Sequence, residues 1–155
     1  MERKTNVAAA DGRQELTITR EFDLPVELLF TAYVEPEIIE QWMGTKVLKL
    51  ESKKHGSYQI ETHDPKGNIA FRANGVIHEL ISNQKIIRTF EMEGTPFGVQ
   101  LEVYEFESID DETSKLTMHV IYESVEQRDQ VLKLPFAQGI NMAHNRIQEI
   151  LSKSK

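Results

Sequence analysis

The chain has 155 residues, no cysteine and a formal net charge of −7. Its length suits about one domain with its own core, and the missing cysteines exclude disulfides, thiol catalysis and cysteine metal ligands. The acidic balance argues against a nucleic-acid or anionic-membrane surface, because both need a positive field. No apolar run approaches the roughly 20 residues of a membrane span. We therefore expect a soluble, cytoplasmic protein.

The N-terminal residues differ from the rest of the chain in their polarity. Residues 1–14 contain no apolar stretch of signal-peptide length, so we expect a flexible N-terminal arm there. No interdomain linker interrupts the remainder, which predicts a single domain over residues 15–152. In residues 15–22, apolar side chains such as Leu16 and Ile18 alternate with threonines, and this pattern predicts a strand.

Two short helices and a series of strands should follow. Pro25 opens the first helix, Pro36 interrupts it, and the second helix ends at Gly44. The later pattern alternates between turn residues and strand-like runs, and Gly75 marks a bulge or bend within one run. An acidic loop over residues 108–114 should join the last two strands. The expected strands are residues 47–50, 57–63, 69–80, 85–92, 99–107 and 115–122.

The last long segment, residues 134–151, has the period of an amphipathic helix of about five turns. Amide and acidic residues should lie opposite its apolar stripe. The apolar stripe consists of Phe136, Ile140, Ala143, Ile147, Ile150 and Leu151. The fold class is therefore α+β: a curved antiparallel sheet of six or seven strands wrapped around a long C-terminal helix, with two short helices after the first strand.

Short motifs occur in a fixed order along nearly the whole chain. They are Arg20 with Phe22, Pro25, Glu35-Pro36, Trp42 with Gly44, GSYQI at residues 56–60, GVIHEL at residues 75–80, KLT at residues 115–117, and Arg128, Asp129 and Gly139. Over residues 15–151 this order resembles the activator of Hsp90 ATPase homologue 1-like family. That family belongs to the START-like, or Bet v 1-like, helix-grip superfamily.

The resemblance implies a helix-grip fold, in which the sheet curls around the C-terminal helix and leaves an apolar cavity between them. Members of the superfamily use this cavity for lipids, polyketides, hormones and other small hydrophobic molecules. The eukaryotic protein that gives the family its name binds the Hsp90 chaperone. The resemblance thus implies two alternatives, ligand binding and chaperone association.

Two residues could bring a polar group into such a cavity. His144, at the margin of the apolar stripe, would contact a ligand or shuttle a proton, or else bond the sheet rim or water. Arg88 shares a strand face with Ile86, Phe90 and Met92. It is either a buried cation that needs a partner or an anionic ligand group, or a side chain that reaches water at the sheet end. For both residues we favour the second interpretation.

Aromatic and sulfur-containing side chains supply the rest of the expected lining. Trp42 and Met43 in the second short helix would close one end of the cavity, or serve as ordinary core anchors. The expected ligand-binding residues are Trp42, Met43, Tyr58, Phe71, Arg88, Phe90, Tyr104, Met118, Phe136, Ile140 and His144.

No motif predicts a metal, a cofactor or a catalytic constellation. The five histidines do not stand at ligand spacing, and we find no nucleophile elbow, phosphate-binding glycine loop or dinucleotide fingerprint. We therefore expect no metal and no cofactor. Glu102 and the acidic residues after it favour a solvated hairpin over an acid–base pair.

Three functions stay open at this point. The leading hypothesis is a protein that binds a small hydrophobic or amphipathic molecule. An alternative is a stress-related protein that interacts with an Hsp90-type chaperone through its surface. A third is a cyclase- or hydrolase-like enzyme that uses His144, Arg88 or Tyr104 in the cavity. We expect a monomer or weak homodimer, with neither nucleic acid nor membrane as a partner.

Overall fold

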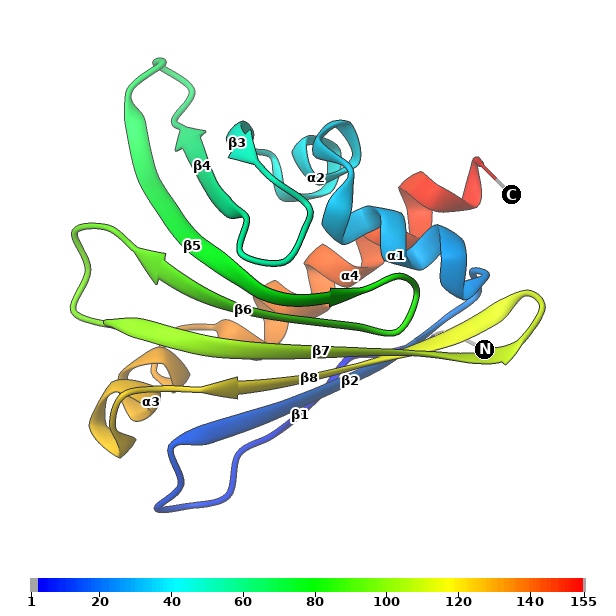
Figure 1. The fold of residues 1–155 in the computed structure, drawn as a ribbon. Coiled ribbons are helices and arrows are strands. Elements are labelled where there is room, and N and C mark those ends of the chain that lie inside the picture. The colour runs from blue at the N-terminus through cyan, green and yellow to red at the C-terminus, as the bar shows by residue number, and fades with distance from the viewer. Residues whose placement is uncertain (1–2, 155) are drawn as a thin grey trace.

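The computed structural model describes residues 3–154, so residues 1 and 2 of the expected arm lie outside the described part. Within it, an antiparallel sheet of eight strands curls around one long helix (Figure 1). The strands are β1 Asn6–Ala8, β2 Glu15–Phe22, β3 Lys46–Leu50, β4 Ser57–His63, β5 Ile69–Ile81, β6 Lys85–Met92, β7 Val99–Asp110 and β8 Thr113–Ile121. The helices are α1 Val26–Val34, α2 Pro36–Met43, α3 Val125–Leu132 and α4 Phe136–Ser152.

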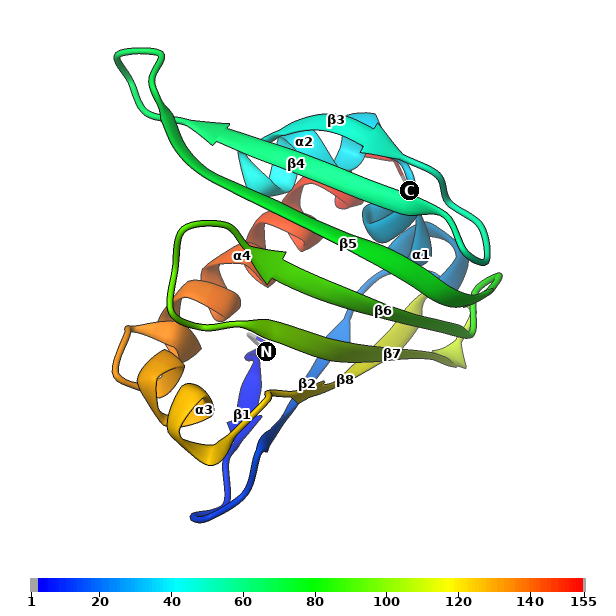
Figure 2. The ribbon, with the colours of Figure 1, turned by 60° about the vertical axis from the view of Figure 1, so that its left-hand side comes forward.

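The strands are ordered β1-β2-β8-β7-β6-β5-β4-β3 in the sheet. β2 pairs with β8, which lies far away in the sequence, and the other neighbours are consecutive strands. Figure 2 shows α4 on the concave side of the sheet, with α1 and α2 beside its C-terminal half. This arrangement confirms the predicted α+β helix-grip fold.

The predicted number of six or seven strands is wrong, because β1 adds an eighth strand. β1 lies in the segment expected to be the N-terminal arm, and its three residues pair with β2 from Asn6 opposite Thr19 to Ala8 opposite Thr17. Backbone hydrogen bonds form this pairing. Three residues are too few to show an alternating side-chain pattern, so periodicity carries no strand signal there.

The acidic loop expected over residues 108–114 is also wrong, since most of it is strand. β7 continues to Asp110 and β8 begins at Thr113, so only two residues remain between them. The Oδ1 atom of Asp110 accepts a hydrogen bond from the backbone N–H of Glu112 at 2.8 Å. Polar side chains of this kind indicate solvent exposure, but they do not stop backbone pairing in an exposed hairpin.

The core lies where β2, α1 and the C-terminal half of α4 meet. Leu16, Ile18 and Phe22 point inward from β2 at alternate positions and are 0–1 % exposed. Leu29 of α1 and Ile147 of α4 pack in the same cluster. Each such side chain contributes roughly 1.5–3 kcal/mol by leaving water, and this cluster fixes α4 against one half of the sheet.

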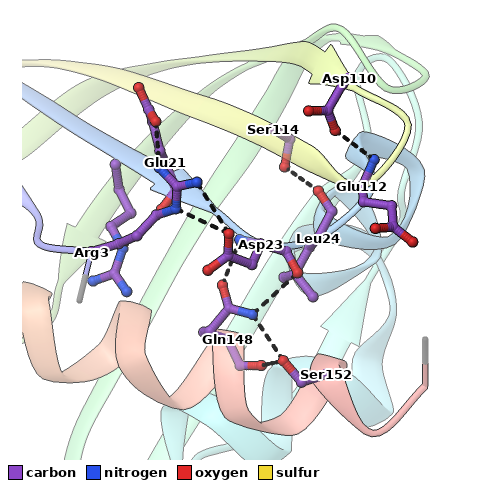
Figure 3. Close-up of polar contacts among 10 residues, drawn as sticks. Arg3, Glu21, Asp23, Leu24, Asp110, Glu112, Ser114, Gln148 and Ser152 are labelled. Atoms are coloured by element: carbon purple, nitrogen blue, oxygen red, sulfur yellow. Dashed lines mark hydrogen bonds and ion pairs between the residues drawn. The ribbon is translucent and has the colours of Figure 1, made fainter. Parts of the chain in front are cut away.

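Amide side chains of α4 tie the helix to the β1–β2 side. Gln148 accepts a hydrogen bond from the backbone N–H of Asp23 at 2.8 Å and donates one to its carbonyl at 3.3 Å (Figure 3). In the same region, the hydroxyl of Ser114 donates to the carbonyl of Leu24 at 2.7 Å. None of the helices within residues 3–154 is long and apolar enough to cross a membrane.

Candidate functional site: a cavity between the long helix and the sheet

A cavity of about 390 Å³ lies between α4 and the inner face of strands β6, β7 and β8. Its wall is mainly apolar, with a few polar side chains from β6 and β7. The size and character are those of ligand pockets, which usually combine an apolar lining with a few polar groups. Eight of the expected ligand-binding residues line it: Trp42, Met43, Arg88, Phe90, Tyr104, Met118, Phe136 and Ile140.

Strand register explains which side chains of the sheet reach this cavity. Arg88 of β6 lies directly opposite Glu102 of β7, and Tyr104 of β7 lies opposite Met118 of β8. Phe90 follows Arg88 by two residues and so points to the same side. Alternation along each strand therefore puts an arginine, a glutamate and a tyrosine side by side on a mainly apolar face.

These three side chains form a closed hydrogen-bonded cluster. The Nε atom of Arg88 donates to Oε1 of Glu102 at 2.8 Å, and its Nη2 atom donates to the Tyr104 hydroxyl at 2.8 Å. The Tyr104 hydroxyl donates to the same carboxylate oxygen at 2.9 Å. Gln100 donates to the other oxygen, Oε2, at 2.7 Å. Glu102 is only 5 % exposed, and both oxygens of its carboxylate thus accept hydrogen bonds.

The interpretation that Arg88 reaches water at the sheet end is wrong. Its side chain is 17 % exposed, and the carboxylate of Glu102 is its partner. The guanidinium also lies over two rings, 4.8 Å from the centroid of Tyr58 and 5.0 Å from that of Tyr104. Cation–π contacts and an ion pair together hold the charge of Arg88 against the sheet.

The ring of Tyr58 packs against the guanidinium of Arg88, and a glycine in the neighbouring strand leaves room for this ring. The Tyr58 hydroxyl donates to the carbonyl of Thr89 at 2.5 Å. Gly75 lies opposite Tyr58 in the sheet, and a Cβ there would come within 2.6 Å of the Tyr58 hydroxyl and 2.0 Å of the Thr89 carbonyl oxygen. The glycine is therefore needed for close approach of the ring.

Burial keeps the phenol of Tyr104 protonated. Removal from water raises the pKa of Tyr104 well above its ordinary value, and the nearby charge of Arg88 only partly opposes this. At neutral pH the group is consequently a hydrogen-bond donor to Glu102 rather than a base.

The opposite wall comes from α4 and α2. Phe136, Ile140 and Ala143 face the cavity at steps of four and three residues, and Arg146 continues the row. Trp42 is fixed at this wall, because its indole N–H donates to the carbonyl of Ala32 at 2.7 Å. The wall is thus set by rigid helical elements.

Three expected residues lie outside the cavity. Tyr58 lies behind Arg88, and Phe71 is half-buried near the start of β5. His144 points to the β1–β2 side, where its Nδ1 atom bonds the Thr5 hydroxyl at 2.7 Å and its ring packs against Phe22.

His144 is 1 % exposed, and its Nε2 atom has no hydrogen-bond partner within residues 3–154. Burial lowers the pKa of His144 from 6.5 to about 3, and the positive charge of Arg20 adds to this effect. The imidazole is therefore neutral at pH 7.

Several residues of the site escape sequence reasoning. The acidic composition around Glu102 favours a solvated hairpin. Glu102 and Tyr104 are two residues apart on one strand, however, so they share a face of the sheet. This spacing could have placed Glu102 on the inner face. Arg146 follows Ala143 by three residues on the helix and could have been found in the same way. Phe97 reaches the cavity from the β6–β7 loop, which no periodicity describes.

No group of three or more histidine, aspartate or glutamate side chains within residues 3–154 is placed to hold a metal ion. The carboxylate of Glu61 contacts Arg72 and His63 instead, at 2.7 and 2.8 Å. It is thus used in an ion pair with Arg72 and a polar contact with His63.

One family model matches the chain, and it is the family that the sequence motifs resemble. The model of the family described as activator of Hsp90 ATPase homolog 1-like protein matches residues 23–152. The chain belongs to this family. Membership supports a ligand-binding or chaperone-associated role in general terms.

Solved structures from bacteria share the fold of this family member. A crystal structure from Rhodobacter sphaeroides is 19 % identical, with a TM-score of 0.84 over 98 % of this chain and 100 % of the other. A protein from Mycobacterium smegmatis is 24 % identical, with a TM-score of 0.81 over 97 % and 98 % of the two chains. An Arthrobacter aurescens protein is 18 % identical, with a TM-score of 0.84 over 96 % and 91 %. A comparison with curated proteins gave no significant match.

Proposed function

We propose that this protein binds a small hydrophobic or amphipathic molecule in the cavity between α4 and strands β6–β8. The observation that carries the proposal is the cavity of about 390 Å³, whose mainly apolar wall also holds a satisfied polar cluster. Ligand pockets in proteins are mostly apolar clefts of roughly 300–1,000 Å³ with a few placed polar groups. The size and lining of this solvent-open cavity therefore favour an occupant.

The polar cluster would give such a ligand an orientation. Nε and Nη2 of Arg88 are used by Glu102 and Tyr104, whereas its Nη1 atom donates to no residue within the described chain. A hydroxyl or carbonyl oxygen of a ligand could accept from Nη1. We propose as contact residues the eight expected ones that line the cavity: Trp42, Met43, Arg88, Phe90, Tyr104, Met118, Phe136 and Ile140.

Native mass spectrometry of the purified protein, followed by denaturing extraction, tests the proposal directly. A neutral fluorescent probe, Nile red, provides a second measurement. Ala143→Phe places a ring in the cavity, whereas Ala137→Phe adds the same ring at an exposed position of α4 that does not line it. We expect Ala143→Phe to abolish Nile red binding and Ala137→Phe to leave it unchanged.

Equal binding by both variants would refute the cavity as the site. If the wild-type protein binds neither a co-purified molecule nor Nile red, the binding function itself is refuted. Circular dichroism of each variant shows whether the fold is retained, so that loss of binding is not confused with unfolding.

Chaperone association is the second candidate, because the family description names an activator of Hsp90 ATPase. The host Hsp90-type chaperone would be mixed with the purified protein, and its ATPase rate and co-purification would be measured. We expect stimulation if this role holds. Absence of both binding and stimulation would exclude it and leave the cavity function unaffected.

A further inference from the structure

Arg146 ends the row of α4 residues that faces the cavity. Phe136, Ile140, Ala143 and Arg146 follow one another at steps of four and three along one side of the helix. The Nε atom of Arg146 donates to the carbonyl of Trp42 at 2.8 Å, which fixes the guanidinium beside α2. The side chain is exposed and lines the cavity at the same time.

The charge of Arg146 is not balanced by a carboxylate. Among residues 3–154 it takes part in no ion pair within 4.0 Å. Arg88 differs, since Glu102 neutralises it at 2.8 Å. The charged residues that line the cavity are Arg88, Glu102 and Arg146. The cavity wall therefore carries an excess of one positive charge, in a chain whose net charge is −7.

An excess positive charge beside an apolar cavity has a definite chemical counterpart. Guanidinium groups bind carboxylates through charge-assisted hydrogen bonds, often with two N–H groups at once. The neighbouring wall offers mainly apolar surface, including Phe90, Met118 and Ile140, along which a hydrocarbon body would be removed from water. One ligand therefore satisfies both features when it carries a single anionic end.

We infer that the ligand is an amphipathic monocarboxylate, with its carboxylate on Arg146 and its apolar body in the cavity along α4. The inference rests on the proposed function and names the class of ligand that the site selects. The Arg88–Glu102 pair is neutral overall and contributes a hydrogen-bond donor without adding to the selection for an anion.

Decanoate and decanol separate charge from apolar contact, because they share the same tail. Their binding would be measured by isothermal titration calorimetry and by the fluorescence of Trp42, the one tryptophan of the chain. We expect decanoate to bind up to about fivefold tighter than decanol, since an ion pair with an exposed guanidinium contributes about 0–1 kcal/mol. The preference should shrink as salt is added.

Three variants assign the preference to Arg146. Arg146→Gln should bring the two affinities to within about twofold, while Arg146→Lys keeps the charge and should keep most of the preference. Arg13→Gln removes the same charge at an exposed position outside the cavity and should behave as wild type. Because Arg146 also bonds Trp42, thermal unfolding of each variant is recorded, and the lysine variant tests the charge if the glutamine variant does not fold.

The outcomes distinguish this inference from the proposed function. If both probes bind equally well to the wild type, the cavity function stands and the monocarboxylate assignment is overturned. The assignment is equally overturned if Arg146→Gln keeps the preference for decanoate. If neither probe binds but Nile red does, the monocarboxylate assignment is overturned and the proposed function stands, whereas absence of Nile red binding and of a co-purified molecule as well refutes both.

Discussion

The two sides of α4 meet the sheet in opposite ways. On the side that faces β1 and β2, which we call the closed side, His144, Asn145 and Gln148 touch the strands or the residues next to them directly. On the side that faces β6, β7 and β8, which we call the cavity side, about 390 Å³ separates helix from sheet. One helix thus seals one half of the curved sheet and leaves the other half open.

Each side contains an arginine that points inward from a strand, and their partners explain the difference. Arg20 of β2 extends across to the helix, where its Nη1 atom donates to Asn145 at 2.9 Å. Arg88 of β6 is instead held back on its own sheet by Glu102 and Tyr104. Arg20 thus fills the space between sheet and helix, because its partner Asn145 lies on the helix. Arg88 leaves that space open, because its partners lie on the sheet.

Removal of the partner that holds Arg88 back should have the largest effect. Glu102→Leu leaves a mostly buried guanidinium without its carboxylate, and we expect the free energy of unfolding to fall by about 3–5 kcal/mol. Urea unfolding measures this loss. The double variant Arg88→Met/Glu102→Leu should recover most of it, because both charges are then gone. A single variant as stable as the wild type would contradict the role assigned to this pair.

The closed side should respond to pH through His144. Its pKa in the folded state is about 3 against 6.5 for an unperturbed histidine, so the unfolded chain binds the proton first as pH falls. This contribution to stability is complete above pH 6.5 and is lost progressively toward pH 3. Between pH 7 and pH 5 the loss should be about 2 kcal/mol.

His144→Asn is the control for this pH dependence. The variant should be less stable at pH 7 because it loses the ring contact with Phe22, yet its stability should change less between pH 7 and pH 5 than that of the wild type. Urea unfolding at the two pH values gives the comparison. An identical decline in both proteins would show that His144 is not the group responsible.

Asn145→Ala should separate stability from binding. The substitution removes an acceptor for Arg20 on the closed side, and a loss of about 1 kcal/mol in the free energy of unfolding is expected. Nile red binding should stay unchanged, because Asn145 does not line the cavity. A change in probe affinity at unchanged stability would mean that the two sides are coupled.

The smallest effect is expected at the outer rim of the closed side. Arg3 pairs with Glu21 at 2.6 Å and with Asp23 at 3.1 Å, but the two carboxylates are about half exposed (Figure 3). Exposed pairs contribute about 0–1 kcal/mol. Arg3→Gln should therefore lower the free energy of unfolding by less than about 1 kcal/mol, and added salt should reduce the difference. A larger loss in urea unfolding would indicate that this rim holds β1 in place.

The fold and much of the cavity wall follow from periodicity. Alternation in residues 85–92 predicts that Arg88 shares a face with Phe90, and the three-and-four spacing predicts that Phe136 and Ile140 face inward. Both patterns hold because each element buries one side. Residues of this kind can be assigned from the amino-acid sequence alone.

Partners across the sheet cannot be assigned in that way. Alternation gives the face of Glu102 but not its position opposite Arg88, which depends on strand register. The helical wheel places His144 near the cavity, but a wheel contains no information on how far the sheet curls around the helix. In the structure, the β1–β2 part of the sheet covers the side of α4 that carries His144. The open volume depends on packing among all these elements, which no local pattern contains.

The order of the elements along the chain has a consequence for synthesis on the ribosome. β2 pairs with β8, and α4 follows all eight described strands in the sequence. A nascent chain carries the apolar inner side of β2 for most of its synthesis before either partner exists. Exposed strands of this kind favour aggregation, and pairing over such a separation is slow. The cavity between α4 and the sheet can therefore form only after the residues of α4 have left the exit tunnel.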